Sequence, residues 1–163
     1  PATVLARAEK RGLLEYLGAQ AGVDVLVIPP TREWPETLLR SQDRWAEHNL
    51  VLLPDTEFEP GRTEETVVWN LSRGFSLVFA TFEVSDPKTW GMVITGAEQT
   101  LIAEKPATKR DGFQAWGMIG FQKNAGHQLF TSLLESCFDH DWKSLPFNSK
   151  TVELTSFRDL TRS

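Results

Sequence analysis

Two stretches of the chain nearly repeat each other: TWGMVITG, Thr89–Gly96, and AWGMIGFQ, Ala115–Gln122. Both are short, apolar and rich in β-branched or aromatic residues, which is typical of a strand. Only two copies occur, 26 residues apart, whereas a repeat architecture needs three or more units. The pair therefore indicates two strands of one sheet rather than a duplication.

Successive side chains of a strand point to opposite faces of the sheet, so the pattern predicts which residues of these two strands share a face. It places Trp90, Met92 and Ile94 on one side of the first strand. By the same pattern, Trp116, Met118 and Gly120 share one side of the second, while Gly91 and Gly117 leave room opposite. The tryptophan and methionine side chains of the two strands would together form one apolar surface. That surface belongs to the core if a helix packs on it, and it lines a pocket if none does.

The remaining pattern predicts an α/β (α+β) fold with a mixed sheet. The N-terminal part predicts an α-β-α-β unit: a helix over 2–21, a strand over 23–30, a helix from about residue 35 to 46 and a strand over 49–54. Residues 66–74 fit a strand or a short helix. Four strand-like runs, within 75–84, 90–96, 100–105 and 114–122, predict an antiparallel meander because Pro, Gly and Asp separate them.

A long amphipathic helix is predicted over 124–142, because apolar residues recur there at three- and four-residue steps. The stripe must be buried against the sheet or a partner, and its predicted interface residues are Phe130, Leu134, Phe138 and Trp142. We expect one domain over residues 1–147, a polar tail or linker over 148–163 and a mobile loop over 55–65. The start at Pro1, without a methionine, suggests a processed or excised domain.

Composition excludes some classes of function. The chain has 163 residues, 40% of them hydrophobic, with a net charge of −5 and a pI of about 5.2. A fold with a real core is expected, and the acidic balance counts against a surface that holds nucleic acid through its phosphates. A single cysteine cannot form an internal disulfide, and no apolar run is long enough to span a bilayer, so a cytoplasmic location is expected.

Catalytic signatures are missing from the sequence. It contains no phosphate loop, dinucleotide fingerprint, nucleophile elbow or zinc spacing, so no cofactor, metal site or catalytic residue is predicted. His127 and His140 lie about four turns apart on the predicted helix, too far to share a metal. Cys137 belongs to the apolar stripe. An enzyme with dispersed residues would draw them from Glu83, Asp86, Glu98, Glu104 and His127.

Aromatic residues are the remaining clue to function. Six Trp and ten Phe are many for one small core, and stacking aromatics often line pockets for flat or sugar-like ligands. Core packing is the alternative for each of them. The predicted ligand-binding residues are Trp69, Trp90, Glu104, Trp116 and Phe121.

The order of elements, with DPKTWGMVITGAE at 86–98 and the final segment QAWGMIGFQKNAGHQLFTSLLESCFDHDW at 114–142, resembles one half of the phospholipase D-like fold. Active members carry a His-x-Lys-x4-Asp signature. Here Lys88 is present, but the histidine and the aspartate are not. The resemblance therefore implies a degenerate member, similar to the ligand-binding domains of TrmB-type transcription regulators. A second resemblance is to DICT-type sensory domains.

These resemblances predict a non-enzymatic sensory or regulatory domain. It would bind a small molecule and signal to a partner or to a fused signalling or DNA-binding domain. Two alternatives stay open: a homodimerising interaction module, and a hydrolase with dispersed catalytic residues.

Overall fold

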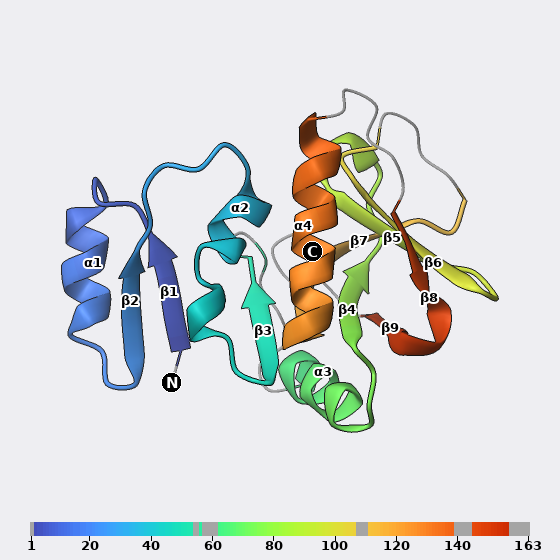
Figure 1. Ribbon diagram of the computed structural model, residues 1–163, viewed down its shortest axis with the longest axis horizontal. Helices are drawn as coiled ribbons and strands as arrows, with labels where there is room; N and C mark the ends of the chain where they lie inside the picture. The colour runs from blue at the N-terminus through green and yellow to red at the C-terminus, as the bar shows by residue number, and fades with distance from the viewer. Residues whose placement is uncertain (1, 54–55, 57–61, 107–110, 139–144, 157–163) are drawn as a thin grey trace. The chain divides into compact units, whose positions relative to one another are not determined.

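The computed structural model describes residues 2–53, 56, 62–106, 111–138 and 145–156 (Figure 1). The chain divides into two compact units, residues 1–45 and residues 46–163. Each unit has its own sheet. The fold is a mixed α/β arrangement, as the sequence predicts.

The first unit is built on a parallel pair of strands, β1 (Ala2–Ala6) and β2 (Val23–Val27), joined by helix α1 (Arg11–Gly18). The register runs from Ala2 opposite Val23 to Ala6 opposite Val27. The prediction of one helix over residues 2–21 is therefore wrong, because its first part pairs with β2. Pairing with a distant segment overrides a local pattern that also fits a helix.

After β2, the chain forms helix α2 (Trp34–Leu39) and a 3-10 turn, Gln42–Arg44. Pro35 sits in the first turn of α2, where a missing backbone N–H costs nothing. Glu36 ties this turn together: it accepts hydrogen bonds from the Arg40 side chain at 2.7 Å and from the Arg32 backbone N–H at 3.0 Å. The helix expected to reach residue 46 thus ends at Leu39.

These contacts lower the pKa of the Glu36 carboxyl below its ordinary value of 4.5, chiefly through the Arg40 side chain and then the Arg32 N–H. A carboxyl with a depressed folded pKa adds stability above its unfolded pKa and loses it as the pH falls through the folded value. We therefore expect the contribution of Glu36 to be complete above about pH 4.5 and to fade below it. A carboxyl-carbon NMR titration should show this low pKa, and Arg40→Met should bring it back toward 4.5; an unchanged value would exclude Arg40 as the cause.

The second unit holds a seven-stranded sheet in the order β8-β6-β5-β7-β4-β9, with β3 on β7 outside this path. The strands are β3 (His48–Leu52), β4 (Leu77–Phe82), β5 (Gly91–Thr95), β6 (Gln99–Glu104), β7 (Gln114–Gln122), β8 (Leu145–Asn148) and β9 (Val152–Ser156). Among the described residues of this sheet, β4 and β9 run parallel to each other and the other pairs are antiparallel. The mixed sheet is confirmed.

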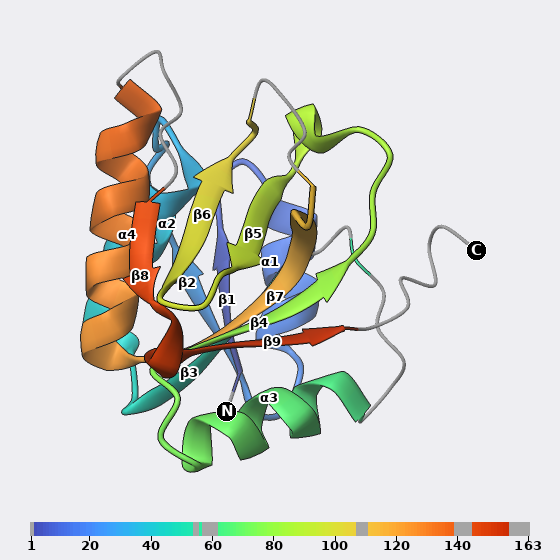
Figure 2. The same ribbon diagram turned by 90° about the vertical axis from the view of Figure 1, so that its right-hand side faces the viewer.

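Two helices cover opposite faces of this sheet, α3 (Arg62–Ser72) and α4 (Lys123–Phe138) (Figure 2). A side chain at Gly120 would run into Val67 and Leu71 of α3. Its neighbour Phe121 points the other way, and its ring packs edge-on against Phe130 of α4 with centroids 5.2 Å apart. The ambiguous segment over 66–74 is thus mainly helical and forms the cover of one face.

Connectivity differs from the predicted meander. All four predicted strands form, but β4 pairs with β7 and β9 and not with β5. Only β5 and β6 make a hairpin among these four. The stretch expected to be a tail contains β9, which lies beside β4 in the sheet. Most of the predicted loop over 55–65 lies outside the described residues, except Thr56 and the first turn of α3.

Within the described part of the chain, no helix has the length and apolar character needed to cross a membrane.

Candidate functional site

The strand neighbours of β7 change at one point along its edge. On one side β7 pairs with β4 throughout; on the other it pairs with β3 over residues 118–122 and with β5 at residues 114 and 115. The two strands therefore part at Trp116 and Gly117. After β3 ends, the Leu53 N–H still donates to the Gly117 carbonyl at 3.3 Å. We call this place the β7 junction: Leu53, Gly91, Glu104, Trp116 and Gly117.

The β7 junction also interrupts the regular pairing of the sheet. β3 ends here at its carboxyl end, and β5 takes over the same edge of β7. The pairing of β4 with β7 also shifts here, because Ala80 lies opposite Met118 and Thr81 lies opposite Trp116. Gly117 is the extra residue of this β-bulge. Bulges are frequent next to active sites, where they redirect a side chain.

The bulge turns Trp116 to the other face, so the prediction that Trp116 shares a side with Met118 and Gly120 is wrong, although Met118 and Gly120 do share one. Met118 packs with Val67 and Leu71 beneath α3. Trp116 instead lies edge-on to Phe79, with ring centroids 6.4 Å apart, and its indole covers Gly91. Trp90 keeps the predicted side with Met92 and packs against Phe82 at 5.1 Å. The two tryptophans of the near-repeat thus lie on opposite faces of the sheet.

Glu104 brings a carboxylate to the junction. It ends β6 directly opposite Gly91, and it is only 6% exposed. The preceding Ala103 packs with Met92 on one face, so alternation puts Glu104 on the other, where the Trp116 ring covers Gly91. A buried carboxylate is costly unless it is hydrogen-bonded, and such groups gather at functional sites. Beside an indole, it suits a ligand that carries hydroxyl groups.

Lys105 follows in an unusual backbone conformation. Its φ is +45°, the only positive value among the described residues other than glycine. Its N–H donates to the Trp90 carbonyl at 2.9 Å, which anchors the strained peptide, while its side chain is exposed. Strain of this kind collects at ligand-binding positions. Lys105 is not among the predicted ligand-binding residues, although the following Pro106 already disfavours a helical conformation for it.

The predicted ligand-binding residues do not form one group. Glu104 and Trp116 meet at the junction, and Trp90 reaches it through its backbone. Phe121 lies at the other end of β7, fully buried under α4. Trp69 lies on the outer side of α3, 57% exposed, with the Arg73 guanidinium stacked 4.6 Å above its ring. Ligand binding by these five residues stays a prediction. Only Glu104, Trp116 and the backbone of Trp90 lie at or next to the β7 junction.

The structure describes the side chains of only two of the four predicted interface residues. Phe130 is buried against the sheet of its own unit, and Leu134 is half-buried. The Phe138 side chain, together with Trp142 and His140, lies outside what is described. A homodimer stays a prediction. In the part of the chain that the structure describes, no three His, Cys, Asp or Glu side chains are grouped to hold a metal ion.

Comparison with known proteins identifies the fold. No protein-family model and no curated protein matches the chain. Among solved structures, a putative glucose-1-phosphate thymidylyltransferase from Bacillus anthracis, in complex with sucrose, matches with a TM-score of 0.68 and 14% identity, over 96% of this chain and 68% of that one. A mannose-1-phosphate geranyltransferase from Thermus thermophilus matches with a TM-score of 0.59 and 18% identity, over 84% of this chain and 47% of that one.

These matches establish the fold and correct two predictions. The resemblance to phospholipase D-like TrmB-type regulators, with DICT-type domains as second choice, is wrong, since the matching structures bear the names of sugar-phosphate transferases. The prediction of a non-enzymatic sensory or transcription-regulating domain is wrong for the same reason. The chain spans about half the length of the Thermus protein and about two thirds of the Bacillus protein.

Proposed function

We propose that the chain is part of a sugar-phosphate nucleotidyltransferase and that it binds a sugar 1-phosphate at the β7 junction. The observation that carries this proposal is the succession of a buried carboxylate and a lysine, Glu104 and Lys105, near the place where β3 and β5 part. The names of both matching proteins contain a hexose 1-phosphate, and the Bacillus structure holds sucrose. A cytoplasmic location is part of the same proposal.

The chemistry of the junction fits this ligand class. A sugar ring presents hydroxyl groups, and an ionised carboxylate accepts their hydrogen bonds more strongly than a neutral group does. Glu104 supplies carboxyl oxygens on the face where the Trp116 indole covers Gly91. The phosphate needs a nearby cation, and Lys105, the next residue in the chain, carries an exposed ammonium group. Neighbouring positions in the chain thus serve the two ends of one ligand.

Calorimetric titration tests the proposal. Glucose 1-phosphate and mannose 1-phosphate should bind the chain, and glucose or inorganic phosphate alone should bind this site more weakly, because each supplies only one of the two contacts. Equal binding of glucose and glucose 1-phosphate would contradict a role for the lysine. Absence of binding by either sugar phosphate would contradict the proposal as a whole.

Lys105 offers a second test, because its strain and its charge can be separated. Lys105→Gly should remove both, and Lys105→Met only the charge. We expect both variants to bind glucose 1-phosphate about tenfold more weakly, the loss of one charge-assisted contact. Only the glycine variant should gain stability, by up to roughly 1 kcal/mol, since glycine adopts a positive φ freely. Urea unfolding measures the second effect; a glycine variant no more stable than the methionine variant would show that the conformation carries no strain.

A further inference from the structure

We propose that Trp90 is a positioning residue of the sugar-phosphate site: its ring holds the backbone that anchors Lys105, and it thereby gives the site its preference for a phosphorylated sugar. This role rests on the proposed function, since Lys105 supplies the positive charge there. The Trp90 ring lies with Met92 on the face of the sheet opposite to Glu104. It therefore acts through the backbone and does not touch the ligand.

Lys105 is held at the point where the β5–β6 hairpin ends. The last pair of this ladder is Gly91 opposite Glu104. One step further, the Lys105 N–H donates to the Trp90 carbonyl at 2.9 Å. Lys105 has a φ of +45° and precedes Pro106, which has no N–H to donate. A residue in such a conformation persists only when its surroundings hold it there, so the bond to Trp90 supplies a restraint that Lys105 needs.

The positive φ also takes Lys105 out of the regular alternation of β6. In an extended strand, Lys105 would follow Ala103 to the face of Met92, opposite to Glu104. β6 instead ends at Glu104, and the backbone changes direction at Lys105. Adjacent side chains of an extended strand point to opposite faces, so Glu104 and Lys105 can serve one ligand only while this change of direction is kept.

Trp90 is fixed to the sheet by its ring. It stands between a 3-10 turn, Pro87–Thr89, and the first residue of β5, and it is half-buried. Its ring packs edge-on against Phe82 of β4, with centroids 5.1 Å apart. The apolar cluster that it joins consists of Phe82, Met92, Ala103, Phe113 and Ala115. Because a packed aromatic ring buries a large area, it ties the start of β5, and with it the Trp90 carbonyl, to β4.

Loss of the ring should release Lys105 but not Glu104. Glu104 belongs to β6, which pairs with β5 over five successive residue pairs and with β8 on its other side. Lys105 lies beyond this ladder and is held by the Trp90 carbonyl. Truncation of Trp90 therefore disturbs the cation of the site more than its carboxylate. We expect it to weaken the binding of a sugar phosphate more than that of a neutral sugar.

The test combines amide hydrogen exchange with calorimetry. Without ligand, the Lys105 amide should exchange about tenfold faster in Trp90→Ala than in the parent chain, because its acceptor is no longer held in place. The same variant should bind glucose 1-phosphate about tenfold more weakly, and glucose within about twofold of the parent. Trp90→Phe keeps a ring for Phe82 and should restore both quantities to within about threefold of the parent.

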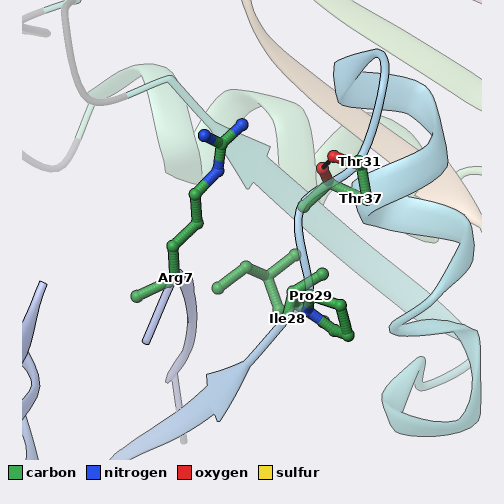
Figure 3. Close-up of a pocket in the computed structure, with 7 residues that line it drawn as sticks. Arg7, Ile28, Pro29, Thr31 and Thr37 are labelled. Atoms are coloured by element: carbon green, nitrogen blue, oxygen red, sulfur yellow. Dashed lines mark hydrogen bonds between the residues drawn. The ribbon is translucent and has the colours of Figure 1, made fainter. Parts of the chain in front are cut away.

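Phe113→Ala is the matched control. It removes another aromatic ring from the same cluster and leaves the Lys105 anchor in place, so exchange and affinity should stay within about twofold of the parent. The NMR signals of Gly91 and Lys105 assign the binding to the β7 junction. A separate cavity of about 120 Å³ in the first unit, with Arg7 and Thr31 in its lining, is followed by the signals of its own residues (Figure 3).

A double variant, Trp90→Ala with Lys105→Met, shows whether Trp90 acts through Lys105. Once the charge is gone, loss of the ring should weaken the binding of glucose 1-phosphate by less than about twofold. A further loss of about tenfold would overturn the proposal, because Trp90 would then act by another route. An unchanged exchange rate of the Lys105 amide in Trp90→Ala, or an equal effect of Phe113→Ala, would also overturn it.

Failure of this role and failure of the proposed function give different results. Binding of glucose 1-phosphate by the parent, together with equally tight binding by Trp90→Ala, would overturn only the role of Trp90. Absence of binding by the parent would overturn both.

Discussion

Gly91→Ala is expected to lower the free energy of unfolding by about 3 kcal/mol, the upper range for overpacking a core. A methyl group on Gly91 would fall within the Trp116 indole. That ring cannot move aside freely, since Trp116 is 2% exposed and lies against the fully buried Phe79. Urea unfolding followed by tryptophan fluorescence measures the change.

A double-mutant cycle shows whether Trp116 is the cause. Trp116→Phe removes the part of the ring that covers Gly91, so the double variant should be more stable than the sum of the single effects predicts, by about 1–2 kcal/mol. Gly12→Ala is a control for the glycine change itself, because a methyl group there meets nothing within 4 Å. It lies in α1, where alanine is preferred by about 0.5–1 kcal/mol. Additive effects at Gly91 and Trp116 would refute the described packing.

Glu104→Gln is expected to reduce the affinity for glucose 1-phosphate by about 10- to 100-fold. Glutamine keeps the shape of the side chain but removes the charge, and hydrogen bonds to charged groups contribute roughly 1.5–3 kcal/mol. The free energy of unfolding should stay within about 1 kcal/mol of the parent or rise, since a buried amide costs less than a buried carboxylate. Calorimetry and urea unfolding measure the two quantities.

Glu98→Gln is the matched control for this variant. Glu98 lies in the turn of the same β5–β6 hairpin, at its opposite end, and is exposed, so the same loss of charge there should leave binding unchanged. Equal losses of affinity in Glu98→Gln and Glu104→Gln would show that the net charge of the protein, and not the β7 junction, causes the effect. If Glu104→Gln fails to fold, Lys105→Met still tests the site, because its side chain is exposed.

Local sequence patterns predict the elements of this fold better than their pairing. The apolar steps from Phe130 onward predict α4, and the alternating runs predict β4 to β7. The strand at Ala2–Ala6 could not be identified in the same way, because it exists through its pairing with β2 rather than through its own composition. The partners of β4 are also distant in sequence, so nothing in the run Leu77–Phe82 distinguishes β7 from β5 as its neighbour.

The candidate site was only partly predictable for related reasons. Glu104 was selected from the sequence, but the facing of Trp116 could not be found by alternation, which assumes a regular strand without the bulge at Gly117. Lys105 begins the only dense basic run of the sequence, Lys105–Arg110, but such a run is typical of an exposed loop and does not indicate a binding site. The hydrogen bond between the Lys105 N–H and the Trp90 carbonyl exists only in the folded β5–β6 hairpin. Sites assembled in this way leave no local motif.

The most direct test of the proposed sugar-phosphate site is a 15N NMR titration of the whole chain with glucose 1-phosphate. The proposal predicts saturable shifts of the amide signals of Gly91, Lys105 and Gly117, which lie at or next to the β7 junction. The same signals should not shift in Glu104→Gln. Saturating ligand that leaves these three amides unshifted would contradict it.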